Sequence, residues 1–247
     1  MFFIKHPYIT QTDKHGNTVQ VTDIFSTLDP SSFDIYKNSK YSIQYYIREG
    51  DTPESISLKL YKKQSYSWIV MIINGMKNVY NDWPLSSIAF DSYVKTKYGG
   101  LSSLFFKLDT INNYDIKKGN IITRTGVNNT KAEVIDWNPS LSKLTIKQLS
   151  GSFSTNQNIS FEGNSNIIAN IGRVNLYEQE SLHHFEQNGI YIDPLLGYLQ
   201  GYINGVSNDV ITNYEYEIKL NDKKRLIFLP LPEVALRIEK EYSNLMV

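Results

Sequence analysis

The stretch Tyr46-Ile47-Arg48-Glu49-Gly50-Asp51-Thr52-Pro53-Glu54 indicates how the first half of the chain folds, because it joins a strand pattern to a helix start. Upstream of it, residues 42–48 begin with alternating apolar and polar side chains, as a half-buried strand does. Gly50 supplies a tight turn, Asp51 or Thr52 can cap the first free N–H groups of a helix, and Pro53 fits the first helical position. The stretch therefore predicts a strand, a turn and a helix in that order.

Two further helices are expected downstream. Tyr61 lies on the apolar face of the first helix, and Trp68 opens the apolar run of a second, which Ser65 or Ser67 can cap. Asn74-Gly75 can end this second helix, because both residues tolerate a left-handed C-cap. The pattern of residues 87–98 predicts a third helix, closed by two glycines.

A turn with a large aromatic residue separates the second and third helices. It has the sequence Asn81-Asp82-Trp83-Pro84, in which Trp83 is expected to be buried against the second helix. The interpretation makes Trp83 an anchor of this part of the chain.

The pattern of turns and strands divides the chain into four segments of an α+β protein. Residues 1–41 are expected to form an extended arm, and residues 42–105 a module that stays folded when the arm is removed. Short strand signals at about ten-residue spacing over residues 112–172 predict a small antiparallel β-barrel or sandwich. Residues 173–247 are expected to form a mixed α/β C-terminal part.

Several local signals organise the C-terminal part. Asn188-Gly189 is the preferred two-residue turn of a β-hairpin. Thr212 and Glu215 have the spacing of a capping box that opens a helix ending near Lys223. A short apolar strand follows from Arg225, and Pro232 fits the first turn of a final helix.

Composition excludes several classes of protein. The 247 residues contain equal numbers of basic and acidic residues, 25 of each, which argues against a nucleic-acid partner. The absence of Cys excludes disulfides, thiolate metal sites and a Cys nucleophile. No apolar run approaches the roughly 20 residues of a membrane span, and the first residues lack the order of a signal peptide.

No pattern of catalytic residues stands out. The phosphate-binding, dinucleotide-binding and nucleophile-elbow motifs are absent. His183 and His184 are adjacent in a predicted strand, where neighbouring side chains point to opposite faces, so both cannot easily bind one metal ion. We therefore expect no enzyme, no cofactor, no metal and no small-molecule substrate.

Two features leave alternatives open. The basic run Lys223-Lys224-Arg225 is either a solvated helix end or a salt-bridging group for a partner protein. The Tyr and Trp residues gathered between positions 41 and 83 either pack a core or form a contact surface, where such residues are enriched.

The quoted stretch resembles the opening of a LysM module, a βααβ fold that usually binds N-acetylglucosamine-containing glycans. The usual last strand is replaced here by residues 79–86. Gly50-Asp51-Thr52-Pro53-Glu54, Lys59-Leu60-Tyr61, Trp68-Ile69-Val70, Asn74 and Asn81-Asp82-Trp83-Pro84-Leu85 together resemble the baseplate wedge protein 53 family of T-even-type contractile phages. Residues 21–25, 211–217 and 220–225 agree with it.

The resemblance implies a structural, non-enzymatic subunit of the tail baseplate. It would join wedge proteins around the central hub in six or a multiple of six copies, and would be assembled in the host cytoplasm into the virion. The alternative is a module that binds peptidoglycan or chitin glycans. The candidate interface residues are Gly50, Asp51, Thr52, Pro53, Tyr61, Trp68, Asn74, Asp82, Trp83, Pro84, Lys223 and Arg225.

Overall fold

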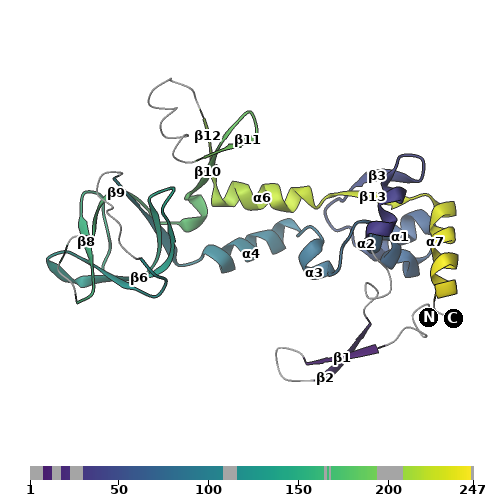
Figure 1. Cartoon of the computed structure of the whole chain (residues 1–247), viewed down its shortest axis with the longest axis horizontal. Helices are drawn as coiled ribbons and strands as arrows, with labels where there is room; N and C mark the ends of the chain where they lie inside the picture. The colour runs from purple at the N-terminus through teal and green to yellow at the C-terminus, as the bar shows by residue number, and fades with distance from the viewer. Residues whose placement is uncertain are drawn as a thin grey trace. The chain divides into compact units, whose positions relative to one another are not determined.

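The computed structural model describes residues 8–12, 18–22, 30–107, 116–163, 166, 168–193 and 208–245 (Figure 1). It contains both helices and strands, which confirms the α+β class. The chain forms two compact units, each described separately below. Unit 1 comprises residues 1–87 and 220–247, and unit 2 comprises residues 88–219. Unit 2 is therefore an insertion in the sequence of unit 1.

Unit 1 contains helices, short 3-10 helices and two pairs of antiparallel strands. One pair, β1 and β2, forms a hairpin near the N-terminus. The elements are β1 (Tyr8–Thr12), β2 (Thr18–Thr22), η3 (Pro30–Lys37), β3 (Ser42–Tyr46), α1 (Pro53–Tyr61), η4 (Gln64–Tyr66), α2 (Ser67–Ile73), α3 (Val79–Asp82), β13 (Leu226–Pro230) and α7 (Pro232–Leu245).

The start of α1 follows the sequence prediction and settles which residue caps it. The Oγ1 atom of Thr52 accepts a hydrogen bond from the Ser55 N–H at 3.1 Å, and the Ser55 Oγ atom accepts one from the Thr52 N–H at 2.9 Å. Thr52 is thus the N-cap of a capping box. Gly50 has a φ of +80°, which explains a glycine at this turn.

The start of α2 differs from the prediction. Its N-cap residue is Tyr66, which makes no side-chain capping bond, so neither Ser65 nor Ser67 caps the helix. The 3-10 helix η4 leads directly into α2 instead. At the other end Gly75 has a φ of +67°, as expected for a glycine that follows a helix.

Strand β3 pairs with a strand from the far end of the chain. Ser42 lies opposite Pro230, and Tyr46 lies opposite Leu226. Both strands were predicted, but in different segments. Within the predicted module, residues 42–105, the one strand that follows α2 is β4 (Leu101–Phe106), and its partners are strands of unit 2 rather than β3. A self-contained LysM-like module is therefore not shown, and β13 supplies the second strand of this sheet.

The core of unit 1 unites side chains from both parts of its sequence. Phe33 of η3 also lies in this core, although residues 1–41 were expected to form an extended arm. Burial of its ring explains why the chain departs from an extended arm here. The buried residues are Phe33, Ile47, Ile56, Tyr61, Tyr66, Trp68, Ile69, Val70, Ile72, Ile73, Met76, Trp83, Ile227, Leu229, Ala235, Ile238 and Tyr242.

Unit 2 is built on a six-stranded antiparallel sheet. Its strands are β4 (Leu101–Phe106), β5 (Ile121–Arg124), β6 (Val127–Asn138), β7 (Lys143–Ser150), β8 (Asn158–Phe161) and β9 (Ala169–Asn175). They pair in the order β4-β7-β6-β5-β8-β9, and β9 pairs back with β4. The β8–β9 seam has only the pairs Asn158–Asn170 and Ile159–Ala169, so the sheet is barrel-like rather than an evenly closed barrel. Leu104, Ile122, Val134, Leu144 and Ile171 are among the side chains that fill it.

Two helices and a smaller sheet complete unit 2 (Figure 1). The elements are α4 (Ser87–Tyr98), η5 (Glu178–Glu180), β10 (Leu182–Gln187), β11 (Ile190–Ile192), β12 (Asp209–Thr212) and α6 (Asn213–Lys223). The predicted bounds of α4, the Asn188-Gly189 hairpin turn and the Thr212–Glu215 capping box are all confirmed.

Candidate interface

The turn before α1 is held by a buried carboxylate. Asp51 accepts hydrogen bonds from the Tyr45 hydroxyl group at 2.7 Å, the Arg48 N–H at 3.0 Å and the Lys59 ammonium group at 2.7 Å. Burial alone would raise the pKa of Asp51, but these hydrogen bonds outweigh it and lower the pKa. Asp51 therefore ties β3 to α1 as an ionised group.

Trp83 connects this turn to the segment that follows α3. Its indole Nε1 atom donates a hydrogen bond to the Asp51 carbonyl oxygen at 3.0 Å. The side chain is 8% exposed and belongs to the same core as Trp68 of α2, and Pro84 beside it is buried. The predicted turn residues Asp51 and Trp83 thus lie together.

Asn74 lies at the end of α2 and pairs with the edge of β13. Its amide group donates to the Phe228 carbonyl oxygen at 2.8 Å and accepts from the Phe228 N–H at 2.8 Å. It also donates to the Val70 carbonyl oxygen at 2.7 Å. Asn74 therefore provides β13 with the hydrogen bonds that a neighbouring strand would otherwise provide.

Two aromatic residues bind the C-terminal elements from inside the core. The Tyr61 hydroxyl group donates to the Pro230 carbonyl oxygen at 2.9 Å, and burial raises the pKa of Tyr61 well above its usual value. The ring centroids of Trp68 and of Tyr242 in α7 are 5.2 Å apart. Core packing, one of the two alternatives for these aromatic residues, is thus what the structure shows for them.

Arg225 makes its contacts within its own unit. Its guanidinium group donates to the Ile47 carbonyl oxygen at 3.4 Å, the Leu85 carbonyl oxygen at 3.2 Å and the Asp222 carboxylate at 3.1 Å. The two interpretations of the basic run were a solvated helix end and a partner contact. For Arg225 the structure shows a third arrangement, because the residue joins three backbone segments of unit 1.

The other two lysines of the run differ from Arg225. The Lys224 ammonium group donates to the Asn81 carbonyl oxygen at 2.6 Å, which places the run beside α3. Lys223 is exposed to solvent. Of the three basic residues, Lys223 therefore has the side chain best placed for contact with another molecule.

The α3 turn is fixed by hydrogen bonds and contributes no buried side chain. The Asp82 carboxylate accepts the N–H groups of Lys77 and Asn78 at 2.7 and 2.8 Å. The Asn78 side chain accepts the Tyr80 N–H at 2.8 Å and caps the helix. Tyr80 is 89% exposed. Tyr80 belongs to the aromatic residues for which the sequence left core packing and a contact surface open, and its exposure rules out core packing for this residue.

Comparison with known proteins assigns the chain to a family. A family model described as base plate wedge protein 53 matches residues 1–131, more than half of the chain. The chain belongs to the base plate wedge protein 53 family. A search of curated proteins found no match.

Membership gives the protein a structural role in the phage tail baseplate, and so a place in the virion. The match includes Gly50, Asp51, Thr52, Pro53 and α3, which form one connected part of unit 1. It does not reach β13, which the structure shows to be the partner of β3. In the described part of this wedge protein, no helix is long and apolar enough to cross a membrane.

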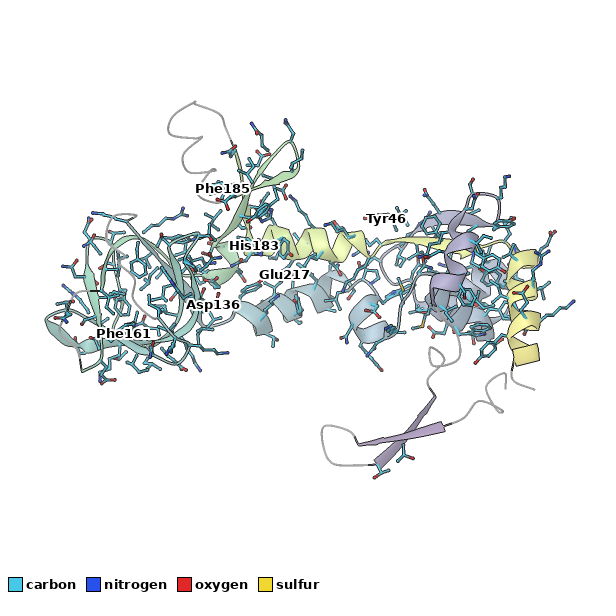
Figure 2. All side chains as sticks on the ribbon, in the orientation of Figure 1. Tyr46, Asp136, Phe161, His183, Phe185 and Glu217 are labelled. Atoms are coloured by element: carbon cyan, nitrogen blue, oxygen red, sulfur yellow. The ribbon has the colours of Figure 1, made fainter. Side chains whose placement is uncertain are left out.

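Unit 2 of the wedge protein contains a buried carboxylate between α4 and α6 (Figure 2). Glu217 accepts hydrogen bonds from Lys97 at 2.5 Å, Tyr98 at 2.8 Å and Tyr93 at 3.1 Å. Burial would raise the pKa of Glu217, but the Lys97 and Tyr98 contacts lower it overall. Both carboxylate oxygens of Glu217 accept hydrogen bonds from residues of α4, so Glu217 joins α6 to α4.

The two adjacent histidines lie closer together than predicted. The pairing register of β10 with β12 shifts between Leu182 and His184, and the Nδ1 atoms of His183 and His184 are 2.8 Å apart. The expectation that their side chains point to opposite faces is therefore wrong, because the strand is irregular here. Burial lowers the pKa of His183 to about 4, which keeps this imidazole neutral at pH 7.

The histidine pair is part of a chain of contacts rather than a group of metal ligands. His184 Nε2 lies 3.0 Å from Glu186, which also pairs with Lys219 at 2.5 Å. The His183 ring stacks on the ring of Tyr216 in α6, with 3.8 Å between the two ring centroids. Among the described residues, no group of three or more His, Asp or Glu side chains could hold a metal ion.

A second buried ionic group lies where η5 meets the six-stranded sheet. Lys143 and Glu178, both nearly inaccessible, form a salt bridge of 2.6 Å. Ser103, Thr145 and Asn213 also bond to Glu178. A cavity of about 420 Å³ adjoins this group. Because the buried atoms bond to one another, we interpret the group as structural.

Proposed function

We propose that this family member is a non-enzymatic subunit that joins wedge proteins around the central hub of the baseplate through protein–protein contacts. The observation that carries the proposal is the family match over residues 1–131. The arrangement of unit 1 supports it, because α3 and the adjacent lysines offer an exposed surface fixed to a buried scaffold. The proposal further assigns six or a multiple of six copies to each baseplate, assembled in the host cytoplasm.

The candidate interface residues take different parts in this proposal. Tyr61, Trp68, Trp83 and Pro84 are buried and would position the contact surface from below. Lys223 and the exposed turn residues Gly50 and Thr52 would be available to a partner.

The test is quantitative mass spectrometry of purified, intact phage particles. We expect the protein at a copy number that is a multiple of six relative to tail proteins of known copy number. Its absence from particles would contradict the proposal. In that case, titration of the purified full-length chain with chitin oligomers would examine the glycan-binding alternative.

A further inference from the structure

We infer that Tyr80 and the α3 turn form a preformed docking knob, which inserts into an apolar pocket bordered by carboxylates on a neighbouring baseplate protein. The inference rests on the proposed function and specifies a partner surface for it. The docking knob is defined as α3 together with Lys77 and Lys223.

The first observation is the exposure of Tyr80 on an element without a core role. The Tyr80 side chain is 89% exposed, and Val79 beside it is 37% exposed. No side chain of α3 is buried. The Tyr80 hydroxyl group makes no hydrogen bond to any residue in the described part of the chain. The ring therefore contributes little to the folding of unit 1.

The second observation is that several hydrogen bonds nevertheless hold the turn. Two backbone N–H groups bond to Asp82, the Tyr80 N–H bonds to Asn78, and Lys224 bonds to the Asn81 carbonyl oxygen. Trp83, the next residue after α3, is buried and bonds to the Asp51 carbonyl oxygen. An anchor that is fixed before association loses less conformational freedom on binding, and Tyr is among the residues most enriched at binding hot spots.

The third observation concerns charge. Lys77 and Lys223 are exposed, and neither ammonium group pairs with a carboxylate of the described residues. Of the nearby carboxylates, Asp222 pairs with Arg225, whereas Asp82 accepts backbone N–H groups and keeps its negative charge. The docking knob thus presents one aromatic ring, with two lysine ammonium groups against the single carboxylate of Asp82, so its net charge is positive. The complementary surface is an apolar pocket with acidic residues at its edge.

The experiment supplies variants of the full-length protein during infection by a phage whose own copy of the gene is disabled. Copies per finished particle are then counted by mass spectrometry. We expect Tyr80→Ala to lower incorporation at least about 10-fold, as for a hot-spot residue. Ile35→Ala is the matched control, because Ile35 is also a large apolar side chain of unit 1 and is 64% exposed. It should incorporate at the wild-type level.

A photo-crosslinking amino acid at position 80 identifies the partner. In ultraviolet-irradiated particles, we expect a crosslink to one other baseplate protein, at a site with Asp or Glu residues beside it. Lys223→Glu should lower incorporation in the same direction as Tyr80→Ala. Wild-type incorporation of Tyr80→Ala, an equal loss with Ile35→Ala, or a crosslink to nucleic acid or glycan would overturn the inference.

The outcomes separate this inference from the proposed function. If the wild-type protein is absent from particles, the proposed function fails and the docking knob fails with it. If the wild-type protein is present and Tyr80 has no effect, the docking knob alone is overturned. Unchanged thermal unfolding of purified Tyr80→Ala would show that a loss of incorporation is not a loss of folding.

Discussion

Trp83 shows how one side chain holds the exposed part of unit 1 on its core. Its ring is buried, and its indole N–H donates a hydrogen bond to the Asp51 carbonyl oxygen. Trp83→Ala should lower the free energy of unfolding by about 3–5 kcal/mol, because it leaves a large cavity and an unpaired carbonyl group. Urea denaturation of the variant and the wild-type protein measures this difference in the free energy of unfolding. Tyr80→Ala is the control, expected to change stability by less than about 0.5 kcal/mol. A similar loss in both variants would contradict the assignment.

Asp51 makes the stability of unit 1 depend on pH. Its folded-state pKa lies below the ordinary value of 3.8, because hydrogen bonds from Lys59, Tyr45 and the Arg48 N–H outweigh the effect of burial. The stabilisation is therefore complete above about pH 4 and is lost as the pH falls towards the folded-state pKa.

Asp51→Asn tests this dependence. It should cost about 1–3 kcal/mol at pH 7, since a buried charged acceptor is replaced. The difference from wild type should narrow as the pH falls below 4. Urea denaturation at several pH values between 3 and 7 measures both quantities. A difference that stays constant over this range would show that ionisation of Asp51 does not contribute.

The sequence predicted local features at the residue scale better than long-range ones. The Thr212–Glu215 box was predicted, and the cap of α1 was narrowed to Asp51 or Thr52, because caps depend on neighbours within one turn; the cap expected for α2 was wrong. The hydrogen bonds of Asn74 to Phe228 and the internal role of Arg225 were not readable, because they join residues more than 130 positions apart.

At the scale of elements, η3 changes what a truncation is expected to do. Phe33 lies in the core, and the Leu231 N–H donates to the Tyr41 carbonyl oxygen at 2.8 Å. Deleting residues 1–41 should therefore destabilise unit 1 by at least the roughly 3–5 kcal/mol of a lost buried Phe. This revises the expectation that the remaining module stays folded.

Deleting residues 1–29 is the matched control, because it leaves Phe33 in place. We expect its thermal unfolding to stay close to that of the full chain, and Phe33→Ala to reproduce most of the effect of the longer deletion. Equal stability of the two truncated chains would show that η3 does not support the core.

The elements themselves were largely predictable, and their partners were not. Periodicity identified β3 and β13 as strands, but a strand pattern does not reveal which strand it pairs with. The shift of register at His184 was likewise invisible, because a regular alternation was the only guide to side-chain direction.

At the scale of the whole molecule, the chain has two compact units with separate cores. Leu144 is fully buried in unit 2, so Leu144→Ala should cost about 2–5 kcal/mol there. In hydrogen-exchange measurements, we expect Leu144→Ala to speed exchange in the strands of unit 2, and Trp83→Ala to speed it in α1 and α2. Equal acceleration in both units by either variant would show that they unfold together.

The pairing of β3 with β13 has a consequence for the order of synthesis. The ribosome releases all of unit 2 before β13 and α7, so unit 2 can fold while residues 30–87 still lack their partner strand. Lys224, which bonds to the α3 turn, also emerges late. A chain terminated before β13 would therefore lack a closed core in unit 1, and one terminated before Lys224 would also lack one of the hydrogen bonds to the α3 turn. We therefore expect the core of unit 1 to close only after β13 has been synthesised.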